Sequence, residues 1–102
     1  MKTLNHTFLT MQGTKKRIGD IKAIFQNLEY SLKLLHSALI STQNCVTILY
    51  SWGHVIIYTY PQDQVITVEI LHPTIDTVDG ITESLVQIFQ PIKHNIEEVY
   101  RW

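Results

Sequence analysis

Residues 53–71 read GHVIIYTYPQDQVITVEIL and contain the two strands that decide the fold. Residues 54–60 and 65–71 are both rich in β-branched and aromatic side chains. Between them, Pro61 followed by three polar residues is typical of a tight turn, because proline presets the dihedral angle that such a turn needs. The stretch therefore predicts a β-hairpin.

The two faces of this hairpin differ, because successive side chains of a strand point to opposite sides. If Tyr60 lies opposite Val65 or Ile66, we expect one face to pack under helices. That face would carry Val55, Ile57, Thr59, Ile66, Val68 and Ile70. The other face would carry His54, Ile56, Tyr58, Tyr60, Val65, Thr67, Glu69 and Leu71. So apolar a surface is typical of an interface or a ligand groove, and we expect an oligomer that closes it.

Outward from the hairpin, the pattern alternates between helices and strands. Apolar residues recur at three- and four-residue steps from Ile18 to Leu35, which predicts an amphipathic helix that fades near His36. A second helix begins at Asp76 or Thr77, with Val78, Ile81, Leu85, Ile88 and Phe89 on one face, and stops before Pro91. Further strands are expected at 4–11, at 38–42 and 45–50 (as two segments or one bent strand), and at 95–100 as an exposed edge. The order β-α-β-β-β-α-β predicts an α+β fold of ferredoxin-like type, an antiparallel sheet with two helices on one face.

Composition limits the class of protein. The chain has 102 residues, which predicts a single domain spanning 1–102, and 45% hydrophobic and 17% charged residues exclude disorder and a coiled coil. The net charge of −1 gives no basic excess for a nucleic-acid partner or an anionic membrane surface. No apolar run reaches about 18 residues, so we expect no membrane span. With no leader pattern and one cysteine, we expect a cytoplasmic location.

The distribution of charge singles out one carboxylate. No Asp, Glu, Lys or Arg occurs between Lys33 and Asp63, and Glu69 is the only charged residue between Asp63 and Asp76. Tyr58 on the neighbouring strand would share a face with Glu69 and lie directly opposite or diagonal to it. A half-buried carboxylate needs a partner, and a cationic ligand is one candidate. The alternatives are a solvated Glu69 on an edge strand and a Tyr58 that only packs.

Other reactive groups give weaker patterns. The five histidines lack metal-ligand spacing, so no metal site is expected. Cys45 is expected in the core rather than as a nucleophile. No phosphate-binding or nucleophile-elbow motif occurs, and no cofactor is implied.

Residues 53–61 carry a family resemblance. The stretch resembles the bacterial S-adenosylmethionine decarboxylases, whose central motif reads Glu-Ser-His-x-x-Ile-His-Thr-Trp-Pro, and His54, Ile57, Thr59 and Pro61 match. In that family the serine attacks the preceding carbonyl and generates a pyruvoyl group. Here Trp52-Gly53 replaces Glu-Ser, Tyr58 replaces the processing histidine, and the later catalytic cysteine falls near Pro73. Without the pyruvoyl electron sink, decarboxylation has no route.

The chain thus combines a fold suited to the same ligand with an altered chemistry. In this combination it resembles the phage-encoded S-adenosylmethionine lyases, once called hydrolases. That resemblance implies a homotrimer with a PII-like fold that binds S-adenosylmethionine between subunits and cleaves it to 5′-methylthioadenosine and L-homoserine lactone. It implies that Tyr58 and Glu69 line the substrate's amino-acid portion and are the catalytic residues. It also implies depletion of the methyl donor of host restriction enzymes in the bacterial cytoplasm. Three alternatives stay open: a hydrolase that gives homoserine directly, a trimeric sensor of an adenosyl ligand, and a structural domain.

Overall fold

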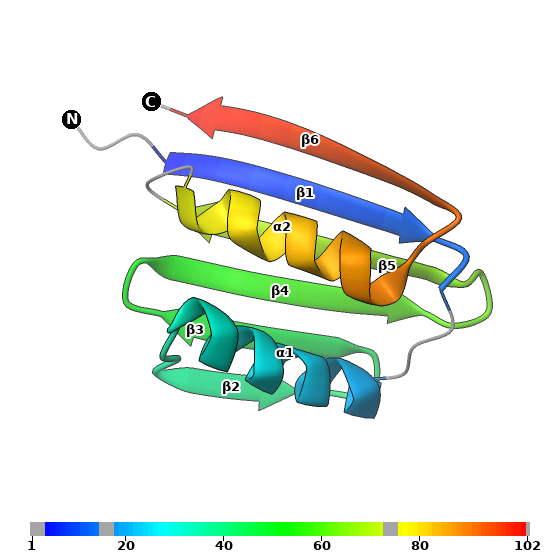
Figure 1. The fold of residues 1–102 in the computed structure, drawn as a ribbon, viewed down its shortest axis with the longest axis horizontal. Coiled ribbons are helices and arrows are strands. Elements are labelled where there is room, and N and C mark those ends of the chain that lie inside the picture. The colour runs from blue at the N-terminus through cyan, green and yellow to red at the C-terminus, as the bar shows by residue number, and fades with distance from the viewer. Residues whose placement is uncertain (1–3, 15–17, 73–75, 102) are drawn as a thin grey trace.

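The computed structural model describes residues 4–14, 18–72 and 76–101. Pro73, which the sequence comparison placed near a catalytic cysteine position, lies outside these ranges. The described part contains six strands and two helices in the order β-α-β-β-β-β-α-β (Figure 1). They are β1 (Leu4–Gln12), α1 (Ile18–Leu32), β2 (Ala38–Ser41), β3 (Cys45–Tyr50), β4 (Gly53–Tyr60), β5 (Val65–His72), α2 (Asp76–Phe89) and β6 (Lys93–Arg101).

All six strands form one sheet in the order β2-β3-β4-β5-β1-β6. Every neighbouring pair is antiparallel, and both helices cover the same face, as Figure 1 shows. The predicted α+β class with two helices on one face is confirmed. The N-terminal strand β1 lies between β5 and β6, so segments that are distant in sequence meet in the half of the sheet next to the central hairpin.

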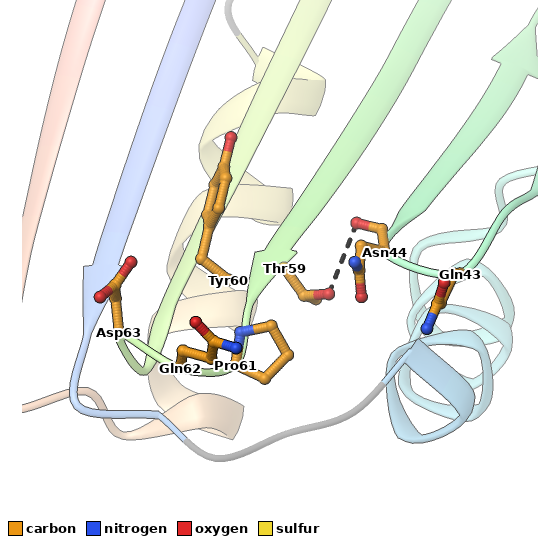
Figure 2. A pocket seen from close by; sticks show the side chains of 7 residues that line it. All are labelled: Gln43, Asn44, Thr59, Tyr60, Pro61, Gln62 and Asp63. Carbon is orange, nitrogen blue, oxygen red and sulfur yellow. Dashed lines mark hydrogen bonds between the residues drawn. The ribbon is translucent and has the colours of Figure 1, made fainter.

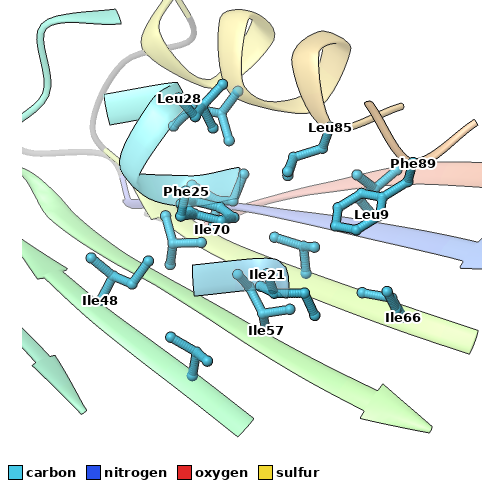
Figure 3. Close-up of a cluster of buried hydrophobic side chains, with 14 of the residues drawn as sticks. Leu9, Ile21, Phe25, Leu28, Ile48, Ile57, Ile66, Ile70, Leu85 and Phe89 are labelled. Carbon is cyan, nitrogen blue, oxygen red and sulfur yellow. The ribbon is translucent and has the colours of Figure 1, made fainter. Parts of the chain in front are cut away.

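The core lies between the helices and the covered face of the sheet (Figure 3). The six side chains predicted to pack under helices are all buried: Val55, Ile57, Thr59, Ile66, Val68 and Ile70. The helices contribute Ile21, Phe25, Leu28, Ile81, Leu85 and Phe89. Since burying one such side chain stabilises a fold by about 1.5–3 kcal/mol, this layer fixes which face of the sheet points away from the helices.

Helix α1 ends earlier than its apolar spacing predicts. It stops at Leu32, and the side chain of Leu35 is 88% exposed. The prediction that Leu35 belongs to the apolar stripe of the helix was therefore wrong. Lys33 adopts a left-handed backbone conformation with φ of 57°. The amide of Leu34 then donates to the carbonyl of Glu29 at 2.8 Å, and the amide of Lys33 donates to Tyr30. This paired pattern caps the last helical turn and ends the helix.

Two other expectations need correction. Residues 38–50 form two strands joined by a turn, which confirms the two-segment alternative. The single bent strand, and with it the order with five strands, was wrong, because the sheet has six strands. Cys45 pairs with Tyr58 on the face away from the helices and is half-buried, so it does not belong to the core. The last strand, β6, lies at the edge of the sheet as predicted, and it is longer than expected.

None of the helices in the described ranges combines the length and the apolarity that a bilayer span requires.

Candidate functional site

The sheet face away from the helices, called the open face below, carries the alternate side chains of every strand. The observed pairing places Tyr60 opposite Val65, one of the two partners expected. The other partner expected, Ile66, was wrong, since Ile66 pairs with Thr59. A register with Tyr60 opposite Ile66 would also have put Tyr58 and Glu69 on opposite faces, so only the Val65 register gives the shared face that was predicted. Tyr58 is 39% exposed and Tyr60 is 47% exposed on this face, so large aromatic surface faces away from the core.

Glu69 lies in the middle of β5, at the centre of the open face. It pairs with Ile56 of β4 on one side and with Phe8 of β1 on the other. Because β5 is an internal strand, the alternative of a solvated carboxylate on an edge strand is wrong. The side chain of Glu69 is 29% exposed, so neighbouring side chains exclude part of its water.

Tyr58 and Glu69 line the same hollow on the open face. Tyr58 pairs with Thr67, so it stands diagonal to Glu69 across β4 and β5, which is one of the two expected arrangements. Their hollow, called the Glu69 hollow, has a volume of about 340 Å³. The other side chains that line it on the open face are Phe8, Thr10, Thr67 and Glu97. Its described lining therefore holds two carboxylates and no basic residue.

One further side chain contacts Glu69. The Nε2 atom of His6 lies 3.5 Å from Oε1 of Glu69. The ring of His6 also stacks on the ring of Phe8, with centroids 5.7 Å apart and an angle of 24° between the planes. Sequence reasoning missed His6, Phe8 and Glu97 as members of the site. No local pattern could reveal them, because the pairing of β1 with β5 and β6 is non-local.

A second hollow, called the turn hollow, lies where β4 ends (Figure 2). It has a volume of about 390 Å³ and is lined by the polar side chains of Gln43, Asn44, Gln62 and Asp63 together with Thr59, Tyr60 and Pro61. The carbonyl of Asn44 accepts the backbone amide of Thr59 at 2.9 Å and its hydroxyl at 3.4 Å. These bonds hold the β2–β3 turn against the end of β4, two residues beyond Tyr58.

A further ionisable cluster lies away from the open face, at the C-terminal end of α1. The carboxylate of Glu29 is buried and accepts a hydrogen bond from Nδ1 of His36 at 2.8 Å. Burial raises the pKa of Tyr50, and the nearby carboxylate of Glu29 raises it further. This cluster joins α1 to the sheet and has no contact with the Glu69 hollow. Among the described residues, no three His, Cys, Asp or Glu side chains gather closely enough to hold a metal ion.

Comparison with known proteins gives a match in structure and none in sequence. No protein-family model matches the chain, and no curated protein sequence matches it. Among solved structures, the fold is similar to the adenosylmethionine decarboxylase from Aquifex aeolicus VF5, with a TM-score of 0.79. The aligned residues are 14% identical and cover 96% of this chain and 89% of that one. This chain therefore has an adenosylmethionine decarboxylase-like fold.

On this fold, the region that distinguishes the chain from the decarboxylase motif is the β3–β4 turn. Trp52 lies in this turn and Gly53 follows it as the first residue of β4, where an added Cβ atom would overlap the carbonyl oxygen of Leu71. The backbones of β4 and β5 approach so closely here that only glycine fits without movement. The position therefore holds no hydroxyl group and has no room for a serine side chain.

Proposed function

We propose that this protein is an S-adenosylmethionine lyase that binds its substrate in the Glu69 hollow. The observation that carries the proposal is the half-buried carboxylate of Glu69 in a hollow shared with Tyr58, on a fold similar to an adenosylmethionine decarboxylase. A carboxylate in such a place favours a cationic ligand. S-adenosylmethionine supplies two cationic groups, an ammonium and a sulfonium.

The substrate contains its own nucleophile and its own leaving group. One oxygen of its carboxylate attacks the γ-carbon, and the bond from that carbon to the sulfonium breaks. The electron pair of the broken bond stays on sulfur, so methylthioadenosine leaves as a neutral thioether. The ring that closes is L-homoserine lactone, which keeps its ammonium group, and net charge is conserved.

Two physical effects make this step faster in the hollow than in water. Holding the methionine chain folded makes the attack intramolecular and oriented, and such arrangements reach effective molarities of ~10⁵–10⁸ M. The step also brings a negative and a positive charge together and removes both. A partly dry hollow therefore disfavours the separated charges of the reactant more than it disfavours the transition state.

Within this scheme, Glu69 pairs with the substrate ammonium and so orients the carboxylate toward the γ-carbon. Pairing of Glu69 with the sulfonium is less favourable for catalysis, because it would stabilise a charge that the reaction destroys. Tyr58 donates a hydrogen bond to the same end of the substrate and holds the chain folded. No protein group has to form a covalent bond, which fits the absence of a serine at Gly53.

The turn hollow offers a place for the adenosyl portion. Two residues of a strand span about 6.6 Å, so a ligand that passes Tyr58 reaches Tyr60 and the amide groups of the turn hollow. A nucleoside needs an aromatic surface for its base and polar groups for its hydroxyls and ring nitrogens. Tyr60, Gln43, Asn44 and Gln62 supply both kinds.

Three copies of the chain complete the proposal. Closing the open face between subunits of a homotrimer would cover Tyr58 and Tyr60 and exclude water from the Glu69 hollow.

An enzyme of this kind in a bacterial cytoplasm would deplete the methyl donor of restriction enzymes after phage infection. Sedimentation equilibrium tests the assembly: a mass of about 36 kDa, three times the 11.9 kDa chain, supports it, and a stable 11.9 kDa species contradicts it.

The experiment that tests the activity is incubation with S-adenosylmethionine followed by chromatography for methylthioadenosine. We expect the wild type to release methylthioadenosine and Glu69→Gln to release much less. Binding without release would favour the adenosyl-ligand sensor. The absence of both binding and release would favour a structural domain.

A further inference from the structure

His6 contacts the carboxylate of Glu69, the group that is proposed to bind the substrate's ammonium. We propose that His6 is a positioning residue: its neutral ring packs beside the Glu69 carboxylate, and its protonated ring competes with the substrate's ammonium for that carboxylate. This inference rests on the proposed function, because it concerns the cation that Glu69 receives. It adds a pH-dependent control of substrate affinity to the site.

The geometry places the His6 ring directly beside the Glu69 carboxylate. The 3.5 Å separation between Nε2 and Oε1 is long for a hydrogen bond but within the range of an ion pair. Stacking on Phe8 holds the imidazole ring in place. The side chain of His6 is only 19% exposed, so its neighbours help to hold it beside Glu69.

The charges around His6 leave Glu69 as its nearest anionic partner. On β5, Leu71 pairs with His6, and Glu69 is diagonal to it. On β6, Val99 pairs with His6 and Glu97 pairs with Phe8, whereas Lys93 and Arg101 sit at the two ends of that strand. On β4, His54 pairs with Leu71 and is two strands away. A protonated imidazole carries a positive charge, so a proton on His6 changes the charge available to Glu69.

The consequence is a pH effect on binding and not on the chemical step. At high pH the neutral ring leaves Glu69 with its full charge for the ammonium. As the pH falls and His6 is protonated, the substrate must displace an ion pair, so KM rises. Once the substrate is bound at saturation, the ion pair is already broken, and kcat stays the same.

Three variants test the proposal with two readouts. We would measure KM and kcat for S-adenosylmethionine and, by calorimetry, Kd for S-adenosylhomocysteine, which keeps the ammonium but has no sulfonium to expel. The measurements would run from pH 5.5 to 8 on wild type, His6→Asn, His6→Lys and the control His54→Asn. Asn keeps a polar group without titrating, and Lys stays cationic throughout.

In wild type and His54→Asn, we expect KM and Kd to rise about tenfold toward pH 5.5 with kcat at saturation unchanged. In His6→Asn the rise should disappear, and in His6→Lys both constants should be high at every pH. A pH-dependent rise that persists in His6→Asn, or one that disappears equally in His54→Asn, would overturn the proposal. If S-adenosylhomocysteine follows the expected pattern but no turnover occurs, the lyase proposal fails and the role of His6 stands. If S-adenosylhomocysteine binds at no pH, both fail.

Discussion

Glu69 illustrates how one residue can carry a site. Its two cross-strand neighbours, Ile56 and Phe8, are apolar and offer the carboxylate no polar partner, so a cationic ligand would supply one. The histidine beside it gives only a long contact. A carboxylate with these neighbours can receive an ammonium group.

Glu69→Gln keeps the shape of the side chain and removes its charge. Because a hydrogen bond to a charged group contributes about 1.5–3 kcal/mol, we expect kcat/KM to fall by about 10- to 100-fold. Steady-state release of methylthioadenosine measures this. Glu83→Gln, an exposed change on α2, is the matched control and should retain the wild-type rate. Full activity in Glu69→Gln would show that the carboxylate has no part in the reaction.

Tyr58→Phe removes one hydroxyl group and leaves the ring in the hollow. If that hydroxyl holds the methionine chain in its folded form, kcat should fall by about fivefold while KM changes little, since one neutral hydrogen bond contributes about 1 kcal/mol. Full saturation curves separate the two constants. An unchanged kcat would remove Tyr58 from the mechanism and leave it as a packing aromatic.

Among the elements, the hairpin of β4 and β5 was predictable and the strand beside it was not. Strict alternation of side chains and the Pro61 turn specify the hairpin locally, including which residues face the helices. The position of β1 between β5 and β6 depends on pairs of residues that lie 53 to 97 positions apart in the sequence. His6, Phe8 and Glu97 therefore join the site through pairings that local patterns do not encode. The end of α1 at Lys33 escaped prediction for another reason, since a left-handed cap on a lysine has no sequence signature.

The β3–β4 turn leads to a prediction about stability. Gly53→Ser would place a side chain against the carbonyl of Leu71, and overpacking of this kind typically costs about 1–3 kcal/mol. We therefore expect a lower denaturant midpoint and no self-cleavage of the chain. Ser51→Ala, an exposed change in the same turn, should shift the free energy of unfolding by less than about 0.5 kcal/mol. A Gly53→Ser chain as stable as the wild type would show that the two strands separate easily here.

The contact of α1 with β3 predicts a stability change at alkaline pH. Burial, followed by the effect of Glu29, raises the pKa of Tyr50 in the folded state, whereas in the unfolded chain a tyrosine titrates near 10. Above about pH 10 the unfolded state therefore loses a proton that the folded state keeps, and stability falls as pH rises. Denaturant unfolding between pH 8 and 11 should show this decline in the wild type and a weaker one in Tyr50→Phe. Equal slopes in the two proteins would contradict the assignment.

At the scale of the whole molecule, the two faces of one sheet have separate roles. The helices cover one face and hold the fold, while the open face presents Tyr58, Tyr60 and Glu69 with no covering layer within the described chain. The fold class could be predicted from the sequence, because core residues alternate along the strands and recur at three- and four-residue steps along the helices. The site followed only in part, since Glu69 and Tyr58 stand out by their charge and position whereas the residues that surround them come from a distant strand.

The most direct measurement is a proton NMR time course of the wild-type protein with S-adenosylmethionine, read from the earliest minutes. Lyase chemistry predicts that methylthioadenosine and homoserine lactone appear together and in equal amounts, with homoserine following only as the lactone opens. Homoserine that forms from the start without lactone would contradict the intramolecular attack and favour a water activated by Glu69. A spectrum that stays unchanged would contradict the proposal that the protein cleaves S-adenosylmethionine.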